Sequence, residues 1–364
     1  MRITIKAHRK TTVLVKQQTE SPRTITAFRM CAALMHQFFE APVIFFLLSI
    51  LLFPATSFGD QPSVPQSTGV DIIGIQLRID EAMYASDEAF ELAIDGAIRM
   101  AVSDGADRVG RSTLLVFPEY TSVFLALVPY SGHVSNAGSV LDALGRIAQS
   151  DSRISSVYSL FAANSSRVEA VMDRVWGGLA RKYGVSLVAG TRFVYRDGGL
   201  RNALLIYGPG GLREYDQDKV YLTDFELDIV GLSPGTVANA RAYRMNGHRI
   251  ALTVCRDTFF PAWDDAFPGA EYWIDIKANG TEFDAEELAR FGRALPVRIA
   301  RSDATRGMTV CLTGSFLDLF WEGRSFTVHQ DSETVTVGQI AHTYTGDATL
   351  LDVLDHRTAN RDAR

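Results

Sequence analysis

Apolar runs and helically spaced apolar residues alternate along the first half of the chain. Four apolar runs predict strands, and two segments with apolar residues at helical spacing predict helices. The strands are expected at 70–79, 112–119, 185–195 and 200–207. A helix is expected at 88–103, and one or two helices at 153–183. The last two of these strands are joined by Asp197-Gly-Gly199, which is typical of a tight turn.

Paired strands dominate the second half of the chain. Asn246-Gly247 separates two predicted strands, as in a β-hairpin. Strands are expected at 238–245, 248–254, 271–279, 309–316, 324–329 and 349–354, and a helix over 285–302 with a kink at Pro296. Alternating strands and helices followed by paired strands predict an α/β domain with a mixed sheet system.

The first 59 residues do not fit this core. Residues 1–29 carry seven Lys or Arg and one acidic residue, Val43–Phe53 is an apolar run, and small residues follow in 54–59. This order is typical of a secretory signal peptide, and the run is shorter than the ~20 apolar residues that a membrane span needs. We therefore expect 1–59 to be a signal peptide of an exported protein, periplasmic or secreted. An uncleaved membrane anchor is the alternative, and 60–69 is expected to be a linker.

Removal of this leader changes the charge of a chain of 364 residues that is 47% hydrophobic. It leaves 29 basic and 40 acidic residues, a net charge of −11. This charge argues against nucleic acid or an anionic membrane surface as a partner. Cys255 and Cys311 remain, and an exported protein could pair them, but each lies in its own predicted strand, so we expect two unpaired thiols. No spacing of Cys, His and acidic residues indicates a metal site.

Three strand-like segments end in Glu119, Lys219 and Cys255. Taken singly, each residue has an ordinary structural explanation, since a lone cysteine is most often a small buried hydrophobe and most Glu and Lys are solvated. Ligands of open α/β sheets, however, gather outside the carboxyl ends of strands. A reactive thiol also needs a base and a cation, which the other two residues supply. The three together predict a catalytic site.

With their flanks, these residues resemble the signature blocks of the nitrilase superfamily, the carbon–nitrogen hydrolases. The blocks are Phe117-Pro-Glu-Tyr120, Asp218-Lys-Val-Tyr-Leu222 and Cys255-Arg-Asp-Thr-Phe-Phe-Pro261, and later similarities lie at 232–235 and 321–328. The resemblance covers roughly 70–356, with 357–364 as a C-terminal tail. It implies a four-layer α-β-β-α sandwich that commonly forms homodimers or higher homo-oligomers.

The resemblance also implies roles for individual residues. Glu119 would be the general base, Cys255 the nucleophile and Lys219 the cation beside the oxyanion, with Glu226 as the second glutamate that holds the lysine. The backbone N–H of Arg256 would assist at the oxyanion. The implied reaction is hydrolysis of a small amide or carbamoyl compound through a Cys thioester, with no metal or organic cofactor.

Departures from the family pattern affect the expected substrate. Tyr221 stands where many members have histidine, and Arg256-Asp257 stands where true nitrilases have Trp-Glu, which favours an amide over a nitrile. Nitrile hydrolysis, N-acyl transfer and a catalytically silent binding protein remain alternatives. The long segment 121–165 is expected to form a pocket wall or lid.

Four residues near the catalytic positions are expected to bind substrate: Tyr120, Arg192, Phe259 and Trp263. Arg192 or Arg256 could pair with a substrate carboxylate. Either could equally hold a structural acid such as Asp257.

Overall fold

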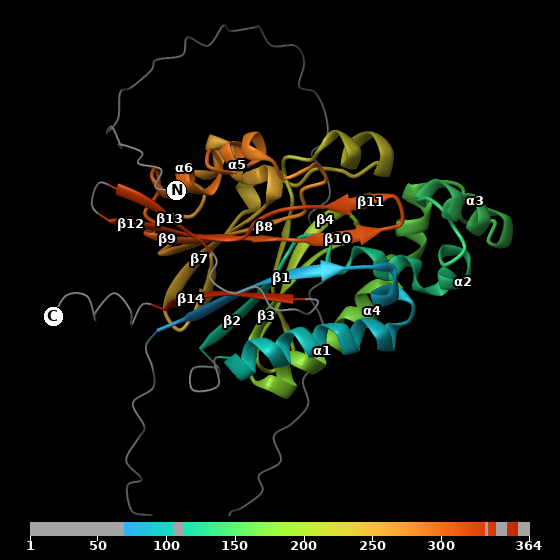
Figure 1. Cartoon of the computed structure of the whole chain (residues 1–364), viewed down its shortest axis with the longest axis horizontal. Coiled ribbons are helices and arrows are strands. Elements are labelled where there is room, and N and C mark those ends of the chain that lie inside the picture. Colours follow the sequence, from blue (N-terminus) through green and yellow to red (C-terminus); the bar gives the residue numbers. More distant parts are fainter. Residues whose placement is uncertain (1–68, 105–111, 332–333, 340–347, 356–364) are drawn as a thin grey trace, which may run out of the picture. The chain divides into compact units, whose positions relative to one another are not determined.

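The computed structural model describes residues 69–104, 112–331, 334–339 and 348–355. These residues belong to one compact unit that contains two β-sheets with helices beside them (Figure 1). The expected signal peptide, the linker up to residue 68 and the C-terminal tail lie outside the described residues. Within the described ranges, no helix is both long enough and apolar enough to cross a bilayer.

The first sheet has the strand order β11-β10-β1-β2-β3-β4-β5, with β14 also paired to β1. Its strands are β1 (Asp71–Ile79), β2 (Thr113–Phe117), β3 (Ser186–Arg196), β4 (Gly199–Tyr207), β5 (Arg213–Asp218), β10 (Thr313–Phe316), β11 (Leu319–Trp321) and β14 (Ala348–Asp355). The neighbours from β10 to β3 are parallel, whereas β3, β4 and β5 form an antiparallel meander. The sheet is therefore mixed, as the sequence predicts.

The second sheet has the order β13-β12-β9-β8-β7-β6. Its strands are β6 (Tyr243–Met245), β7 (His248–Val254), β8 (Tyr272–Lys277), β9 (Arg306–Cys311), β12 (Phe326–Asp331) and β13 (Thr334–Gln339). The central strands β7, β8 and β9 are parallel, and the outer pairs are antiparallel. The predicted Asn246-Gly247 hairpin joins β6 to β7, with both residues at positive φ.

Helices lie beside the outer face of each sheet. The first half of the chain contains η1 (Glu81–Tyr84), α1 (Asp87–Asp104), η2 (Val123–Tyr130), α2 (Ser131–Val134), α3 (Val140–Ser150) and α4 (Val157–Tyr183). The second half contains the short turns η3 (Phe225–Val230), η4 (Val237–Asn239), η5 (Cys255–Phe259) and η6 (Pro261–Trp263), and the helices α5 (Ala285–Phe291) and α6 (Leu295–Ile299). In Figure 1, α1 and α4 lie beside the first sheet, and α5 and α6 lie beside the second.

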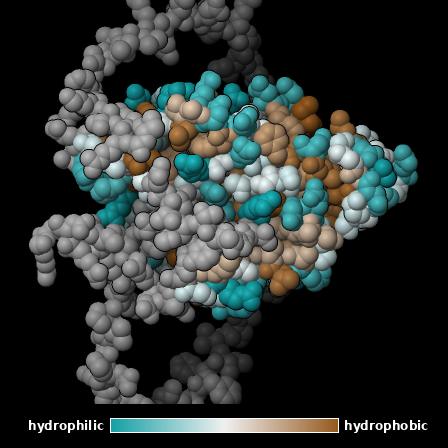
Figure 2. Space-filling model, viewed as in Figure 1, coloured by the Kyte–Doolittle hydropathy of each residue, from teal (hydrophilic) through white to brown (hydrophobic). Residues whose placement is uncertain are grey.

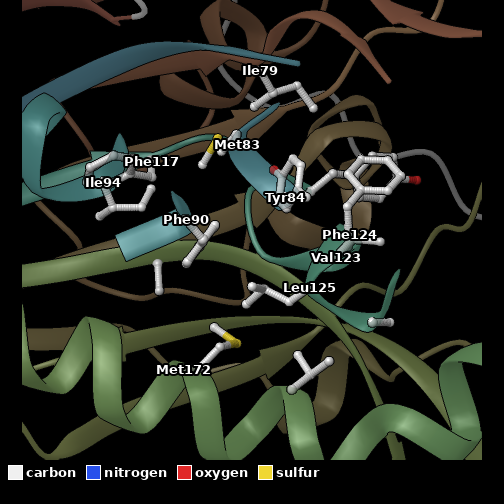
Figure 3. Close-up of a cluster of buried hydrophobic side chains, with 14 of the residues drawn as sticks. Ile79, Met83, Tyr84, Phe90, Ile94, Phe117, Val123, Phe124, Leu125 and Met172 are labelled. Atoms are coloured by element: carbon white, nitrogen blue, oxygen red, sulfur yellow. The ribbon is translucent and has the colours of Figure 1, made fainter. Parts of the chain in front are cut away.

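Three hydrophobic clusters separate these layers. Side chains alternate along a strand, so Leu114 and Val116 of β2 join a cluster with β7, β8 and β9, between the two sheets. Leu115 and Phe117 point to the opposite face, into a cluster shared with α1 and α4, part of which is shown in Figure 3. A third cluster, around Trp273, packs against α5 and α6. This order of helix, sheet, sheet and helix fits the expected α/β sandwich.

Most predicted elements are confirmed within a few residues, but several differ. The strand expected over 309–316 is two strands in different sheets, β9 in the second and β10 in the first. The helix expected over 285–302 is two helices, and Pro296 lies in the first turn of α6, where its missing N–H costs no helical hydrogen bond. The strand expected over 238–245 begins only at Tyr243. The segment Arg213–Asp218, in which little periodicity is visible, forms β5. Cys255 and Cys311 are both unpaired, as predicted.

Candidate functional site

Cys255 lies directly after β7 and begins the turn η5. Its φ of 53° is in the left-handed region, which is uncommon for a residue other than glycine. The buried Lys277 at the end of β8 donates a hydrogen bond from Nζ to the Cys255 carbonyl oxygen at 3.0 Å. Lys277 is itself paired with buried Asp275 at 3.0 Å. The backbone of the thiol-bearing residue is thus held in an unusual conformation by a neighbouring strand.

Glu119 lies two residues beyond β2 and is completely buried. Its Oε1 accepts hydrogen bonds from Lys219 Nζ at 2.8 Å and from Asn202 Nδ2 at 3.0 Å. Its Oε2 accepts the backbone N–H of Ala278 at 3.0 Å. The Cys255 side chain lies near enough to this carboxyl group to lower its pKa. Glu119 is therefore fixed between a cation and a thiol.

Lys219 directly follows β5 and contacts two carboxylates. Besides Glu119, its Nζ donates to Glu226 Oε1 at 3.0 Å and Oε2 at 2.8 Å. Glu226 is on η3, and its Oε2 also accepts the backbone N–H of Thr223 at 2.8 Å. Asn202 on β4 bridges both carboxylates, since its Nδ2 also donates to Glu226 Oε1 at 2.7 Å. The site therefore combines two acids, one ammonium and one amide.

Burial and charge move the pKa values of the two glutamates in opposite directions. Burial raises the pKa of Glu119, and the negative charge of Glu226 adds to this effect, although Lys219 opposes it. Burial alone would also raise the pKa of Glu226, but the charge of Lys219 and the hydrogen bonds to this carboxylate outweigh it and lower the pKa. Glu226 therefore stays ionised beside Lys219, while Glu119 is the carboxyl group that takes up a proton more readily.

The thiol of Cys255 is protonated in the resting site. Burial raises its pKa to about 12, and the charge of Glu119 contributes in the same direction, against Lys219 and Lys277. A thiol with this pKa is a weak nucleophile at neutral pH unless a base removes its proton as it reacts. Glu119 is placed to act as that base.

Asp257 connects the nucleophile turn to the segment after Lys219. Its Oδ1 accepts the backbone N–H groups of Val220 at 3.1 Å and Tyr221 at 2.7 Å. Burial raises the pKa of Asp257 to about 7 despite these hydrogen bonds. Arg256 turns elsewhere and donates to the Leu222 carbonyl oxygen at 2.9 Å. Backbone N–H groups thus hold the Asp257 carboxylate, and Arg256 does not.

A cavity of about 660 Å³ opens above Cys255 and Lys219. Its walls combine aromatic rings with two cationic side chains: Tyr120, Phe225, Phe259, Trp321, Arg256 and Arg290. A cavity of this size fits the range of small-molecule sites in proteins. Cys255 and Lys219 thus face a space large enough for a substrate, whereas Glu119 is fully buried.

Two of the four residues expected to bind substrate line this cavity, and two do not. Tyr120 and Phe259 line it. Arg192 is 1% exposed and is paired with Asp216 at 2.7 Å and Glu169 at 3.1 Å, so it joins β3 to β5 and α4. Trp263 is fully buried and stacks on Phe267 in the core beneath α5 and α6. The expected substrate-binding role does not fit the positions of Arg192 and Trp263.

Three groups in the site were not expected from the sequence: Asn202, Lys277 and the N–H of Ala278. Asn202 is a lone uncharged polar residue in the otherwise mostly apolar run 200–207, and this interruption was the available signal. Lys277 is the last residue of the strand Tyr272–Lys277. A polar residue at the end of a strand is the same signal that singles out the catalytic candidates. A backbone N–H carries no sequence signal.

Among the residues that the structure describes, no cluster of His, Cys, Asp and Glu could hold a metal ion.

Solved structures of one bacterial amidase resemble this chain. The butyramide complex of a mutant of the amidase from Nesterenkonia sp. AN1 has a TM-score of 0.52 and 18% identity, covering 81% of this chain and 94% of that chain. A double mutant of the same amidase in complex with acrylamide has a TM-score of 0.52 and 17% identity, covering 83% and 99%. That amidase is a protein of the nitrilase fold. This chain has the nitrilase fold.

A third structure of this amidase, a mutant, carries the acetamide moiety of fluoroacetamide on its active-site cysteine. Its TM-score is 0.52 at 17% identity, and the match covers 81% of this chain and 97% of that chain. No protein-family model and no curated protein sequence matches this chain. The comparisons thus establish the nitrilase fold, and the chemistry depends on the side chains of the site.

Proposed function

We propose that this protein hydrolyses a non-peptide carbon–nitrogen bond of the amide or carbamoyl type, with Cys255 as nucleophile. One observation carries the proposal: Cys255 and Lys219 line one substrate-sized cavity, and the buried carboxylate of Glu119 contacts the ammonium of Lys219 at 2.8 Å. The amidase structures with butyramide and acrylamide, which have the same fold, support this substrate class.

In the first half of the reaction, Cys255 attacks the amide carbon. Glu119 takes the thiol proton as the C–S bond forms, because the thiol pKa of about 12 leaves almost no thiolate beforehand. Lys219 and the backbone N–H of Arg256 stabilise the negative charge that develops on the carbonyl oxygen. The C–N bond then breaks, and Glu119 returns its proton to the leaving nitrogen. The products of this half are an amine or ammonia and an acyl thioester.

In the second half, water hydrolyses the thioester. Glu119 takes a proton from the attacking water, and the carboxylic acid leaves as the Cys255 thiol is reprotonated. Glu226 keeps Lys219 charged and aimed through both steps, and Asn202 fixes both glutamates. In this mechanism Glu119 cycles its protonation state, whereas Glu226 does not.

Asp257 supports the choice of an amide over a nitrile. In true nitrilases a Trp-Glu pair is expected after the nucleophile, but here the second position is Asp257. Its carboxylate is buried and engaged with the N–H groups of Val220 and Tyr221, so it does not face the substrate.

From the leader and the resemblance, we also propose that the protein is exported and forms a homo-oligomer. N-terminal sequencing of the mature protein checks export, and light scattering checks the oligomeric state.

Ammonia release from a panel of aliphatic amides, ω-amides, carbamoyl compounds and nitriles tests the proposal. We expect the full chain to release ammonia from amides or carbamoyl compounds, and the Cys255→Ala variant to lose this activity by about 10⁴-fold or more. Activity that survives the substitution would contradict the proposal. An amide that releases ammonia only when a second amine is added would identify acyl transfer.

A further inference from the structure

A second cavity of about 240 Å³ adjoins the one above Cys255. Five residues line both cavities: Tyr120, Phe225, Asp318, Leu319 and Trp321. Cys255 and Lys219 line the first cavity and not the second. The second cavity, here called the side pocket, is therefore a branch of the active site without its reactive groups.

Apolar side chains of η2, α3 and α4 form the far wall of the side pocket. They include Phe124 and Leu127 of η2, Ala143 and Leu144 of α3, and Phe161 of α4. These five residues lie in the segment 121–165, which is expected from the sequence to form a pocket wall or lid. Figure 2 shows hydrophobic surface between the β10–β11 hairpin and the tip that carries α2 and α3.

The charged residue Asp318 does not make the side pocket polar. Its Oδ1 accepts the backbone N–H of Val140 at 2.8 Å, at the first residue of α3. This hydrogen bond joins the β10–β11 turn to the helix that closes the pocket. Water in an apolar pocket finds few hydrogen-bond partners, so an alkyl group that displaces it is stabilised.

We infer that the side pocket binds the apolar acyl chain of the substrate, so that the enzyme prefers amides of medium-length aliphatic acids over short ones. This inference rests on the proposed function. The carbonyl carbon would lie at Cys255, and the chain would pass alongside Tyr120 and Trp321, which line both cavities. At roughly 30 Å³ for a group of the size of water or a methylene, the pocket has room for about eight such groups.

Binding of primary alkanamides to the full chain carrying Cys255→Ala tests the inference without turnover. Calorimetry from acetamide to decanamide should show affinity rising roughly three- to fourfold per methylene until the pocket is full. Adding Ala143→Phe, which fills the pocket, should lower the octanamide-to-acetamide affinity ratio at least tenfold. Gln149→Phe places the same side chain at an exposed position of α3 and should leave that ratio unchanged.

A second variant covers the case in which Ala143→Phe fails to fold. Leu144→Ala enlarges the pocket and should move the optimum to longer chains. Affinity independent of chain length, or a length dependence seen with N-alkylacetamides instead of alkanamides, would overturn the inference. If long amides bind as expected but the wild-type chain releases no ammonia from them, the proposed function fails and the side pocket stands.

Discussion

Replacing Glu119 by glutamine should lower kcat for amide hydrolysis by about 10³-fold, within the range that general acid–base catalysis supplies. Glutamine has nearly the shape of glutamate and keeps an oxygen that Asn202 or the Ala278 N–H can contact. The fold should therefore survive, while the proton transfers at the thiol, the leaving nitrogen and the water are lost. Steady-state ammonia release and a thermal melt of both proteins measure the two effects.

The pKa of the Cys255 thiol provides a second readout of Glu119→Gln. The charge of Glu119 helps to raise this pKa to about 12, so its removal should move the pH profile of thiol alkylation to lower pH. A purely structural role for Glu119 would not shift that profile. Glu226→Gln is the matched control, because it removes a carboxylate from the same lysine but keeps Glu119. Equal losses of kcat in the two variants would contradict the assignment of the base.

Replacing Lys219 by methionine should have the largest effect on stability. The change leaves Glu119 and Glu226 buried without their shared cation, and breaking such a buried pair typically costs 3–5 kcal/mol. Hydrolysis should also fall by about 10²- to 10³-fold, since one oxyanion donor is lost. Chemical denaturation at pH 8 measures the loss of unfolding free energy, and ammonia release measures the loss of activity.

The stability loss of Lys219→Met should depend on pH with a definite sign. In the wild type, Lys219 lowers the pKa of Glu226, so this contribution to stability is present above the unfolded pKa and is lost as pH falls. Without Lys219, burial raises the pKa of both glutamates, so the folded variant binds more protons and gains stability as pH falls. The difference in unfolding free energy between the wild type and Lys219→Met should become smaller from pH 8 to pH 5. A difference that stays constant would mean that the two glutamates do not cause the loss of stability.

Glu119 and Cys255 could be predicted from sequence because each follows an apolar strand and ends it with one reactive side chain. The strand rule places such residues at the edge of a sheet where its strands end, and this holds for β2 in the first sheet and for β7 in the second. Lys219 also ends a strand-like segment, but its flanking residues are the stronger signal, since β5 carries charges at alternate positions and shows no apolar run. The register of β4 against β5, which brings Asn202 to the site, depends on tertiary pairing.

Arg192 and Trp263 show where proximity in sequence fails. Both lie close to catalytic segments along the chain, but the side chain of Arg192 is directed to carboxylates on α4 and β5, and that of Trp263 is directed to the core. The direction of a side chain depends on its partners across the fold, which a local pattern does not specify. The side pocket likewise forms only when η2, α3 and α4 meet the β10–β11 turn.

Intact-mass measurement of the acid-quenched enzyme during turnover tests the central claim most directly. The substrate is the amide that gives the fastest ammonia release from the panel. The mechanism predicts a wild-type chain heavier by one acyl group, with the added mass on the peptide that contains Cys255. It also predicts no such adduct and no ammonia release with Cys255→Ala. Ammonia release by the wild type with an acyl group on another residue, or release by Cys255→Ala, would contradict it.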